Sequence, residues 1–234
     1  MSKEKIVLDL CGGTGAWAKP YKDNGYNVIT ITLPDYDIMK AVVLKEFGIM
    51  IFPSNSDTAK DIRINIFDIY GILAAPPCTQ FSIARNDKTA KKPRNLEEGL
   101  MVVDKVKEIV RGCLLYHFRK DDNGLKFWAL ENPKTGYLER FLGKAPFEFE
   151  ACDFGDPYGK KTSLWGEFNF PKKDAVKATK RNFVKYASTD DEVKQEKLKL
   201  IPDGYRKKTG YDTRKVIRSI TPQGFANAFY EANK

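Results

Sequence analysis

The chain has 234 residues, a length that fits one domain with a full core and a small appended lobe. Its hydrophobic content of 42% is ordinary, and no apolar run approaches the roughly 20 residues that a membrane-spanning helix requires, so we expect a cytoplasmic protein with no membrane partner. The four cysteines are far apart and the chain has one histidine, so we expect free thiols and no metal site.

The net charge of +9 is concentrated in two segments of the chain. Residues 172–215 carry +7 and residues 84–94 carry +4, so the remainder is slightly acidic. One basic run alone is usually a solvated face. Two such runs, one of which begins six residues after Cys78, favour a polyanion that approaches a single crevice. Tyr205 and Tyr211 lie among these lysines, and we expect them to contact nucleic acid.

The first elements predict a strand-helix-strand unit. Residues 6–10 form a short apolar strand, and a glycine-rich turn, C-G-G-T-G-A-W, follows it. The next segment ends at Gly25, and the β-branched residues of 28–32 predict a second strand.

Further strands and one long helix follow. Residues 64–69 are irregular or strand-like, and residues 70–75 form a strand. Apolar residues at helical spacing predict an amphipathic helix over 96–119. Residues 121–124 form a turn, and the strand at 127–130 ends in Glu-Asn-Pro. This alternation predicts an α/β fold with a doubly wound, mostly parallel sheet and a ligand crevice beyond the carboxyl ends of its strands.

The pattern changes after about residue 167. Residues 168–215 are rich in lysine and show weak periodicity, which indicates a lobe outside the sheet. Pro222 precedes a final segment in which Phe225 and Phe229 lie on one helical face, so we expect a closing helix that docks on the core.

The most informative stretch is A-A-P-P-C-T-Q-F-S at 74–82. The two prolines remove two backbone donors and fix two φ angles, so the strand cannot continue there. Cys78 therefore lies on a stiff loop at the edge of the crevice, where it is a candidate nucleophile.

Four blocks resemble, in order, the signature motifs of DNA (cytosine-5) methyltransferases. They are D-L-C-G-G-T-G-A-W at 9–17, A-P-P-C-T-Q-F-S at 75–82, L-E-N-P at 130–133 and D-P-Y-G-K-K-T-S-L-W at 156–165, with a weaker echo in R-S-I-T-P-Q-G-F-A at 218–226. The pair of Pro-Pro-Cys and Glu-Asn-Pro in this order and spacing is specific, and the sequence is most similar to compact phage-type members of the family.

The resemblance implies the domain organisation and the partners. Residues 1–166 would form a catalytic domain of the S-adenosylmethionine-dependent methyltransferase type, 167–217 a short basic segment that contacts DNA and recognises the target, and 218–234 a helix that returns to the catalytic domain. The implied cofactor is S-adenosylmethionine, and the implied partner is double-stranded DNA in a bacterium or a phage-infected host. We expect a monomer.

The resemblance assigns the chemistry to a thiol and a carboxyl group. Carbon 5 of cytosine is a poor nucleophile, so a thiolate, here Cys78, must first add to carbon 6. The addition requires ring nitrogen 3 to take up or share a proton, which the carboxyl group of Glu131 would supply. Asn132 and Pro133 are expected to fix the turn that aims this carboxyl group, and Lys161 is expected to contact the cytosine carbonyl.

The resemblance also implies the cofactor site. The family's glycine turn maps onto Asp9, Leu10, Gly12, Gly13, Gly15 and Trp17. Asp61 resembles the acid that meets the adenine amino group, and Pro76 lies next to the adenine face. For the acid that binds the ribose hydroxyls, Asp35 is the best candidate because it falls about 20 residues beyond the glycine turn. Asp37 is the alternative.

The target base must leave the duplex before it can react, so the family surrounds it with contacts to DNA. The residues implied here are Gln80, Ser82 and Arg85 in the loop after the nucleophile, Lys160 and Thr162 in the fourth block, and Arg181, Lys207 and Lys208 in the basic segment.

The sequence departs from the family pattern in the fourth block and in the size of the basic segment. Gly159-Lys160-Lys161-Thr162-Ser163 replaces the usual Gln-x-Arg-x-Arg, and the recognition segment is much shorter than usual, which predicts short or relaxed sequence specificity. Two alternatives stay open: an RNA cytosine-5 methyltransferase, and an inactive methyltransferase-like protein that binds DNA.

Overall fold

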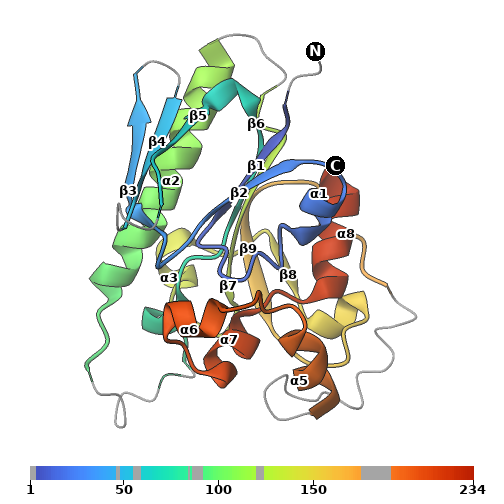
Figure 1. Cartoon of the computed structure of the whole chain (residues 1–234). Helices are drawn as coiled ribbons and strands as arrows, with labels where there is room; N and C mark the ends of the chain where they lie inside the picture. Colours follow the sequence, from blue (N-terminus) through green and yellow to red (C-terminus); the bar gives the residue numbers. More distant parts are fainter. Residues whose placement is uncertain are drawn as a thin grey trace.

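A six-stranded, mostly parallel sheet with helices on both faces forms the centre of the molecule (Figure 1). The computed structural model describes residues 4–45, 48–54, 59–83, 85, 92–119, 124–174 and 191–234. The strand order is β2-β1-β6-β7-β9-β8. This arrangement confirms the predicted doubly wound α/β fold, and no helix of the described ranges is long and apolar enough to cross a membrane.

Four parallel strands build the larger part of the sheet. They are β1 (Ile6–Leu10), β2 (Asn27–Ile31), β6 (Ile69–Ala74) and β7 (Phe127–Pro133). Successive side chains of a strand point to opposite faces, so Leu8 and Leu10 enter one core cluster while Val7 enters the other. A strand that is buried on both faces is apolar at most of its positions, which explains the apolar residues 6–8 and 10 that made β1 predictable; Asp9 is the buried exception.

The remaining two strands pair antiparallel and change the interpretation of Glu-Asn-Pro. β9 (Thr162–Glu167) pairs with β7, and β8 (Phe147–Phe149) pairs with β9. The prediction that the strand ends at Leu130 in a turn was wrong, because Glu131, Asn132 and Pro133 pair with Leu164, Ser163 and Thr162 of β9. The proline is tolerated because it is the last residue of the strand.

One face of the sheet is covered by the long helix α2 (Leu96–Arg119) and by a small second sheet (Figure 1). This three-stranded antiparallel sheet contains β3 (Tyr36–Leu44), β4 (Gly48–Pro53) and β5 (Ile62–Asn65), and the 3-10 turn η1 (Ile66–Asp68) leads from it to β6. The sequence predicts α2 with its observed bounds but predicts no strand over β3 and β4.

An aromatic core fills the opposite face, between the sheet and the helices α1 (Lys19–Asp23) and α8 (Gln223–Asn233). The ring of Phe225 stacks on Phe149 with centroids 4.0 Å apart, and Trp17 packs edge-on against Phe229 at 5.4 Å. The predicted docking of the closing helix is thereby confirmed.

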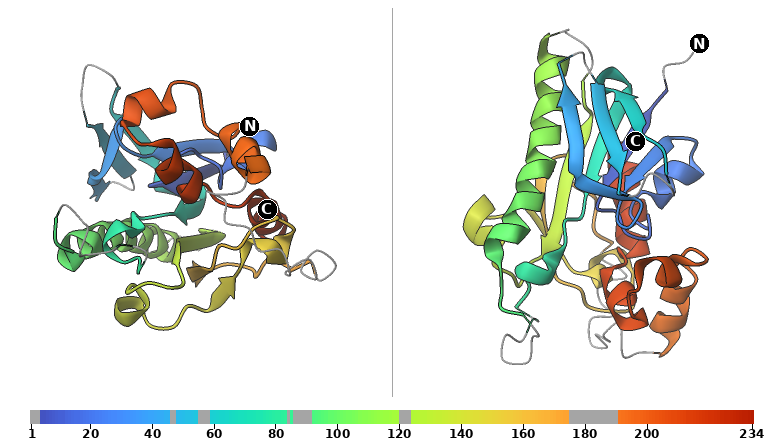
Figure 2. Two further views of the ribbon diagram at one scale, coloured as in Figure 1. Left: turned by 90° about the horizontal axis from the view of Figure 1, so that it is seen from below. Right: turned by 60° about the vertical axis from the view of Figure 1, so that its left-hand side comes forward.

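Three short helices lie at the carboxyl ends of the parallel strands, beneath the sheet in Figure 1 and in front of it in the left view of Figure 2. They are α5 (Asp191–Leu198), α6 (Tyr205–Thr209) and α7 (Thr213–Ser219), and we call them the C-terminal lobe. Ala16 of the glycine turn packs with Val216 and Ile220 of this lobe, so the lobe contacts the crevice edge of the sheet. The remaining short elements are η2 (Cys78–Gln80), α3 (Glu139–Leu142) and η3 (Ala151–Phe154).

Candidate functional site

The cysteine loop begins where β6 ends. Pro76 is buried and Pro77 is exposed, and Cys78 opens the short turn η2. The carbonyl oxygen of Cys78 accepts hydrogen bonds from the backbone N–H groups of Phe81 (2.9 Å) and Ser82 (2.8 Å). Phe81 is fully buried and anchors the turn in the core. The thiol is therefore held on a fixed backbone at a partly exposed position.

β7 holds the cysteine loop by a side chain rather than by the strand ladder. The buried Nδ2 of Asn132 donates a hydrogen bond of 3.0 Å to the carbonyl oxygen of Pro76. Glu131 is the adjacent residue, and its side chain is 12% exposed. Asn132 thus fixes the loop that carries the thiol to the strand that carries the carboxyl group.

Four ionisable side chains from separate segments share this site. Lys160 Nζ lies 3.5 Å from Oε1 of Glu131, and both side chains are largely buried. Burial raises the pKa of the Cys78 thiol and the charge of Glu131 raises it further, whereas Lys160 and Arg218 lower it. The residues that set the pKa of Cys78 come from η2, β7, the loop before β9 and α7, and they are as far as 140 positions apart.

The structure distinguishes the two lysines of the fourth block. Lys160 lies beside Glu131, whereas Lys161 Nζ lies 3.8 Å from Glu150 Oε1 and its side chain is 59% exposed. Thr162 is buried as the first residue of β9. The lysine that neighbours the carboxyl group of Glu131 is therefore Lys160, and the expected contact of Lys161 with the cytosine carbonyl stays a prediction.

The loop after the cysteine uses its own polar groups to fold. Oε1 of Gln80 accepts hydrogen bonds from Arg85 Nη1 (2.7 Å) and from the backbone N–H of Asn95 (2.9 Å). Arg94 Nη1 donates to the carbonyl oxygens of Gln80 (2.7 Å) and Ser82 (3.2 Å). Arg94 was counted only as part of the basic run, and its position near the cysteine loop was the one available signal for this anchoring role.

The glycine turn after β1 fits closely around a buried carboxyl group. A Cβ atom at Gly12 would lie 2.0 Å from Oδ2 of Asp9, so only glycine fits at this position. Gly13 and Gly15 have φ angles of +58° and +75°, and Cys11 has the strained value of +57°. Burial raises the pKa of Asp9 to about 7, against a hydrogen bond with Thr30 that lowers it.

The two flanking members of the predicted glycine block are core residues. Leu10 is 1% exposed and Trp17 is 2% exposed. Trp17 packs on α8, where its ring contacts Phe225 and Phe229.

Asp35 and Asp61 come to one edge of the small sheet. The hydroxyl of Tyr36, next to Asp35, donates a hydrogen bond of 3.0 Å to the carbonyl oxygen of Lys60, next to Asp61. Asp35 forms an ion pair with Lys208 of α6. Asp37 accepts a hydrogen bond from the backbone N–H of Met39 within its own strand.

A buried lysine of the C-terminal lobe lies close to the same charges. Lys197 is 4% exposed, and its Nζ donates to the carbonyl oxygens of Ile217 (3.3 Å) and Ile220 (3.1 Å) at the end of α7. Burial, and then the charge of Lys160, lower the pKa of Lys197 to about 7, whereas Asp156 and Glu131 raise it. Lys197 caps the helix that carries Arg218, and no sequence pattern distinguishes it from the other lysines of the basic segment.

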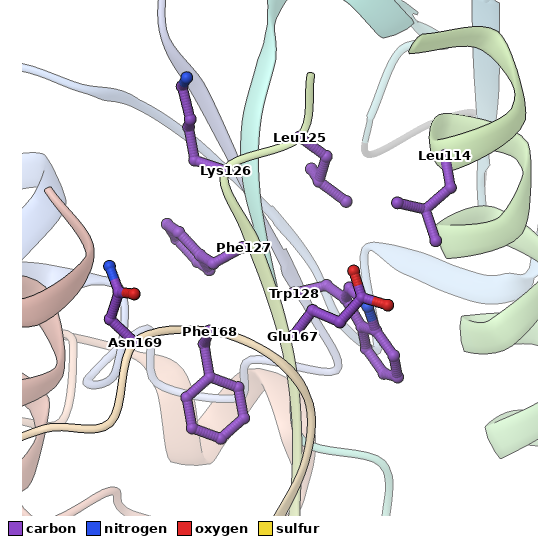
Figure 3. Close-up of a pocket in the computed structure, with 8 residues that line it drawn as sticks. All are labelled: Leu114, Leu125, Lys126, Phe127, Trp128, Glu167, Phe168 and Asn169. Carbon is purple, nitrogen blue, oxygen red and sulfur yellow. The ribbon is translucent and has the colours of Figure 1, made fainter. Parts of the chain in front are cut away.

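Other features lie apart from this site. Arg181 falls outside the described residues. A pocket of about 220 Å³ lies at the opposite end of β7, where Phe127, Trp128, Glu167 and Phe168 line it (Figure 3). Within the described ranges, no group of three or more His, Cys, Asp or Glu side chains could hold a metal ion.

Comparison with known proteins gives one informative similarity. The chain is 29% identical over 91 residues to the type II methyltransferase M.DdeI of Desulfomicrobium norvegicum. The matched stretch covers 38% of this chain and 22% of that protein. No family model matches the chain. The similarity, together with the mostly parallel sheet, supports a methyltransferase family for this protein.

Proposed function

We propose that this protein is an S-adenosylmethionine-dependent DNA (cytosine-5) methyltransferase. The observation that carries the proposal is the meeting of Cys78, Glu131 and Lys160 in one largely buried site. A thiol and a carboxyl group in such a site supply the nucleophile and the proton donor that substitution at carbon 5 of cytosine requires. The similarity to M.DdeI supports the methyltransferase class of this reaction.

In the proposed reaction, Cys78 forms a bond to carbon 6 of a cytosine that has left the duplex. The electrons of the ring's 5,6 double bond move toward nitrogen 3, which takes or shares a proton from Glu131. Carbon 5 would then take the methyl group of S-adenosylmethionine, which would leave as the neutral thioether. Carbon 5 loses its proton to a base, the bond to Cys78 breaks to release the thiolate, and nitrogen 3 returns its proton to Glu131. Lys160, as the cationic neighbour of Glu131 and Cys78, favours the thiolate over the thiol.

The glycine turn and the carboxylates of Asp35 and Asp61 fit a nucleoside cofactor. Gly12 leaves no space for a side chain, Gly13 and Gly15 allow close approach of the backbone, and two acceptors lie at the neighbouring edge. S-adenosylmethionine, when bound there, supplies an electrophilic methyl group. The side chain of Asp9 is 0% exposed, so we infer that it supports the turn from beneath.

The basic charges support a nucleic-acid substrate, with double-stranded DNA proposed. Lys207 of α6 and Arg218 of α7 are exposed, and these helices lie at the carboxyl ends of the parallel strands (Figure 1), where Cys78 follows β6. Contacts of this type bind phosphates without reading sequence, which agrees with the short recognition segment.

A covalent trapping experiment tests the proposal. The full chain is incubated with S-adenosylmethionine and duplex DNA that contains 5-fluorocytosine, whose fluorine cannot leave as a proton does. We expect mass spectrometry to find a methylated adduct on the peptide that carries Cys78. Cys78→Ala should form no adduct and yet bind the cofactor.

Two controls sharpen the result. Cys152→Ala removes a buried thiol outside the site and should form the adduct at the wild-type rate. An RNA duplex of the same sequence tests the other substrate class. A folded protein that binds S-adenosylmethionine but forms no adduct on DNA, or forms one only on RNA, would contradict the proposed function.

A further inference from the structure

The helix α6 belongs to the basic lobe by sequence but lies against the cofactor side of the crevice. Its bounds, Tyr205–Thr209, fall in the middle of the segment 167–217 that the sequence analysis assigned to DNA. Two of its side chains nevertheless contact residues assigned to the cofactor. A helix that was expected to contact DNA thus contacts the proposed cofactor site, which indicates a second role for α6.

The first contact is electrostatic. Lys208 Nζ forms an ion pair with Oδ2 of Asp35, and the two side chains are 52% and 32% exposed. A carboxylate has about four acceptor positions on its two oxygens, so one ammonium group leaves capacity for a hydroxyl donor. Lys208 thus restrains the carboxylate without using up its capacity to accept hydrogen bonds.

The second contact is steric. The hydroxyl of Tyr205 lies 3.5 Å from the position that a Cβ atom on Gly13 would take. Tyr205 is half-buried and packs with Ala16 of the turn, with Val216 of α7 and with Ile220, which follows that helix. The side chain of Tyr205 therefore borders the glycine turn at Gly13.

The neighbouring lysine on the same helix differs. Lys207 is exposed and pairs with no acidic residue in the part of the chain that the structure describes. The two successive lysines of α6 therefore differ: Lys208 pairs with Asp35, whereas Lys207 is exposed to solvent.

We propose that Lys208 and Tyr205 are cofactor-positioning residues, so that α6 closes the S-adenosylmethionine site from the C-terminal lobe. Lys208 acts through Asp35, whose carboxylate it holds in one orientation for the ribose hydroxyls. A restrained acceptor binds more tightly than a freely rotating one because less side-chain entropy is lost on binding. This inference rests on the proposed function, since it assigns Asp35 to the cofactor.

The test measures equilibrium binding of S-adenosylmethionine, and of its demethylated product, to the full chain without DNA. We expect Lys208→Met to weaken both about tenfold, a typical effect of losing one hydrogen bond to a charged group, and Lys208→Arg to restore most of the affinity. Lys207→Met should leave cofactor affinity unchanged. Tyr205→Phe, which keeps the ring, should weaken cofactor binding less than Tyr205→Ala.

A double-mutant cycle separates positioning from general damage. In the Asp35→Asn background, Lys208→Met should weaken cofactor binding less than twofold further, because its effect passes through Asp35. Thermal unfolding should hardly change, since an exposed ion pair contributes little to stability. In turnover, the KM for the cofactor should rise while kcat changes little.

The outcomes distinguish the two proposals. If the folded wild-type protein does not bind S-adenosylmethionine, the proposed function fails. If the wild type binds it and Lys208→Met binds equally well, or if the two substitutions are additive, only the assignment of α6 to the cofactor is wrong. An Asp35→Asn variant with wild-type affinity would overturn that assignment as well.

Discussion

The Cys78 thiol is balanced between opposing charges, and this balance decides when it becomes a nucleophile. Burial and Glu131 favour the neutral thiol, whereas Lys160 and Arg218 favour the thiolate. The raised pKa keeps the thiol protonated in the free protein at neutral pH, which protects it from adventitious reaction. We infer that productive binding has to move this balance toward the thiolate.

Neutralising one neighbour at a time should move the Cys78 pKa in opposite directions. Glu131→Gln removes an anion and lowers the pKa, so iodoacetamide should modify Cys78 faster at pH 8. Lys160→Met removes a cation and raises the pKa, so modification should become slower. The measurement is the rate of alkylation against pH, mapped to the Cys78 peptide by mass spectrometry.

Cys11 provides an internal control for this measurement. Burial, and then Asp9 and Asp37, raise its pKa to about 12, so it should stay largely unmodified in the same samples below pH 10. A Glu131→Gln protein in which Cys78 reacts more slowly than in the wild type would show that the carboxyl group does not act on the thiol by its charge.

At the scale of elements, the closing helix depends on an acid from a distant loop. Oδ2 of Asp156 accepts a hydrogen bond of 3.0 Å from the backbone N–H of Gly224, in the first turn of α8. Backbone groups of Gln223 and Phe225 also stabilise this carboxylate, while burial raises its pKa to about 6. The first turn of a helix has unpaired N–H groups, so Asp156 caps α8 from outside the helix.

Asp156→Ala should lower the free energy of unfolding by about 1 to 2 kcal/mol, the usual cost of losing a helix cap. Asp156→Asn keeps an acceptor but cannot ionise. Because the folded pKa of about 6 lies above the unfolded value, the folded wild type binds more protons between pH 4 and pH 6. Wild-type stability should therefore fall relative to Asp156→Asn as the pH rises through this range, as measured by urea unfolding. Asp104→Asn, on the exposed face of α2, should show neither effect.

The elements that the sequence predicted are those whose pattern is local. β1 is apolar at four of its five positions and α2 repeats its apolar face, so both are predicted with their observed bounds. β3 and β4 were missed because their burial alternates irregularly and their pairing depends on each other. The extension of β7 through Pro133 depends on β9, about 30 residues later, and no local pattern reports such a partner.

In the site, too, the sequence predicts what a local motif carries and misses what depends on distant contacts. Cys78 and Glu131 could be proposed because two short motifs carry them, and the structure brings both to one place. The ion-pair partners of Lys160 and Lys161 could not be assigned from the sequence. The two adjacent lysines have the same side chain, and only the folded loop decides that one pairs with Glu131 and the other with Glu150. Arg85 and Arg94 carry basic charge that the loop uses for its own hydrogen bonds, and composition cannot distinguish such charge from a DNA contact.

At the scale of the whole molecule, the location of the positive charge matters more than its sum. The net charge is +9, yet Lys208 is paired with Asp35 and Lys197 is buried in the C-terminal lobe. Cations that are neutralised or buried do not release counterions from DNA, so only the exposed ones contribute to its salt-dependent binding.

Charge reversal should therefore weaken DNA binding according to position. Lys207→Glu in α6 and Lys199→Glu directly after α5 change exposed residues, and each should lower duplex affinity and reduce the slope of log K against log salt by about 1, the value for one lost phosphate contact. Lys22→Glu makes the same change in net charge on α1, across the sheet from α2, and should leave the slope unchanged. Fluorescence anisotropy with a labelled duplex over a range of salt concentrations gives these slopes. Equal slopes for all three variants would mean that net charge alone attracts the DNA and that the C-terminal lobe forms no defined contact with it.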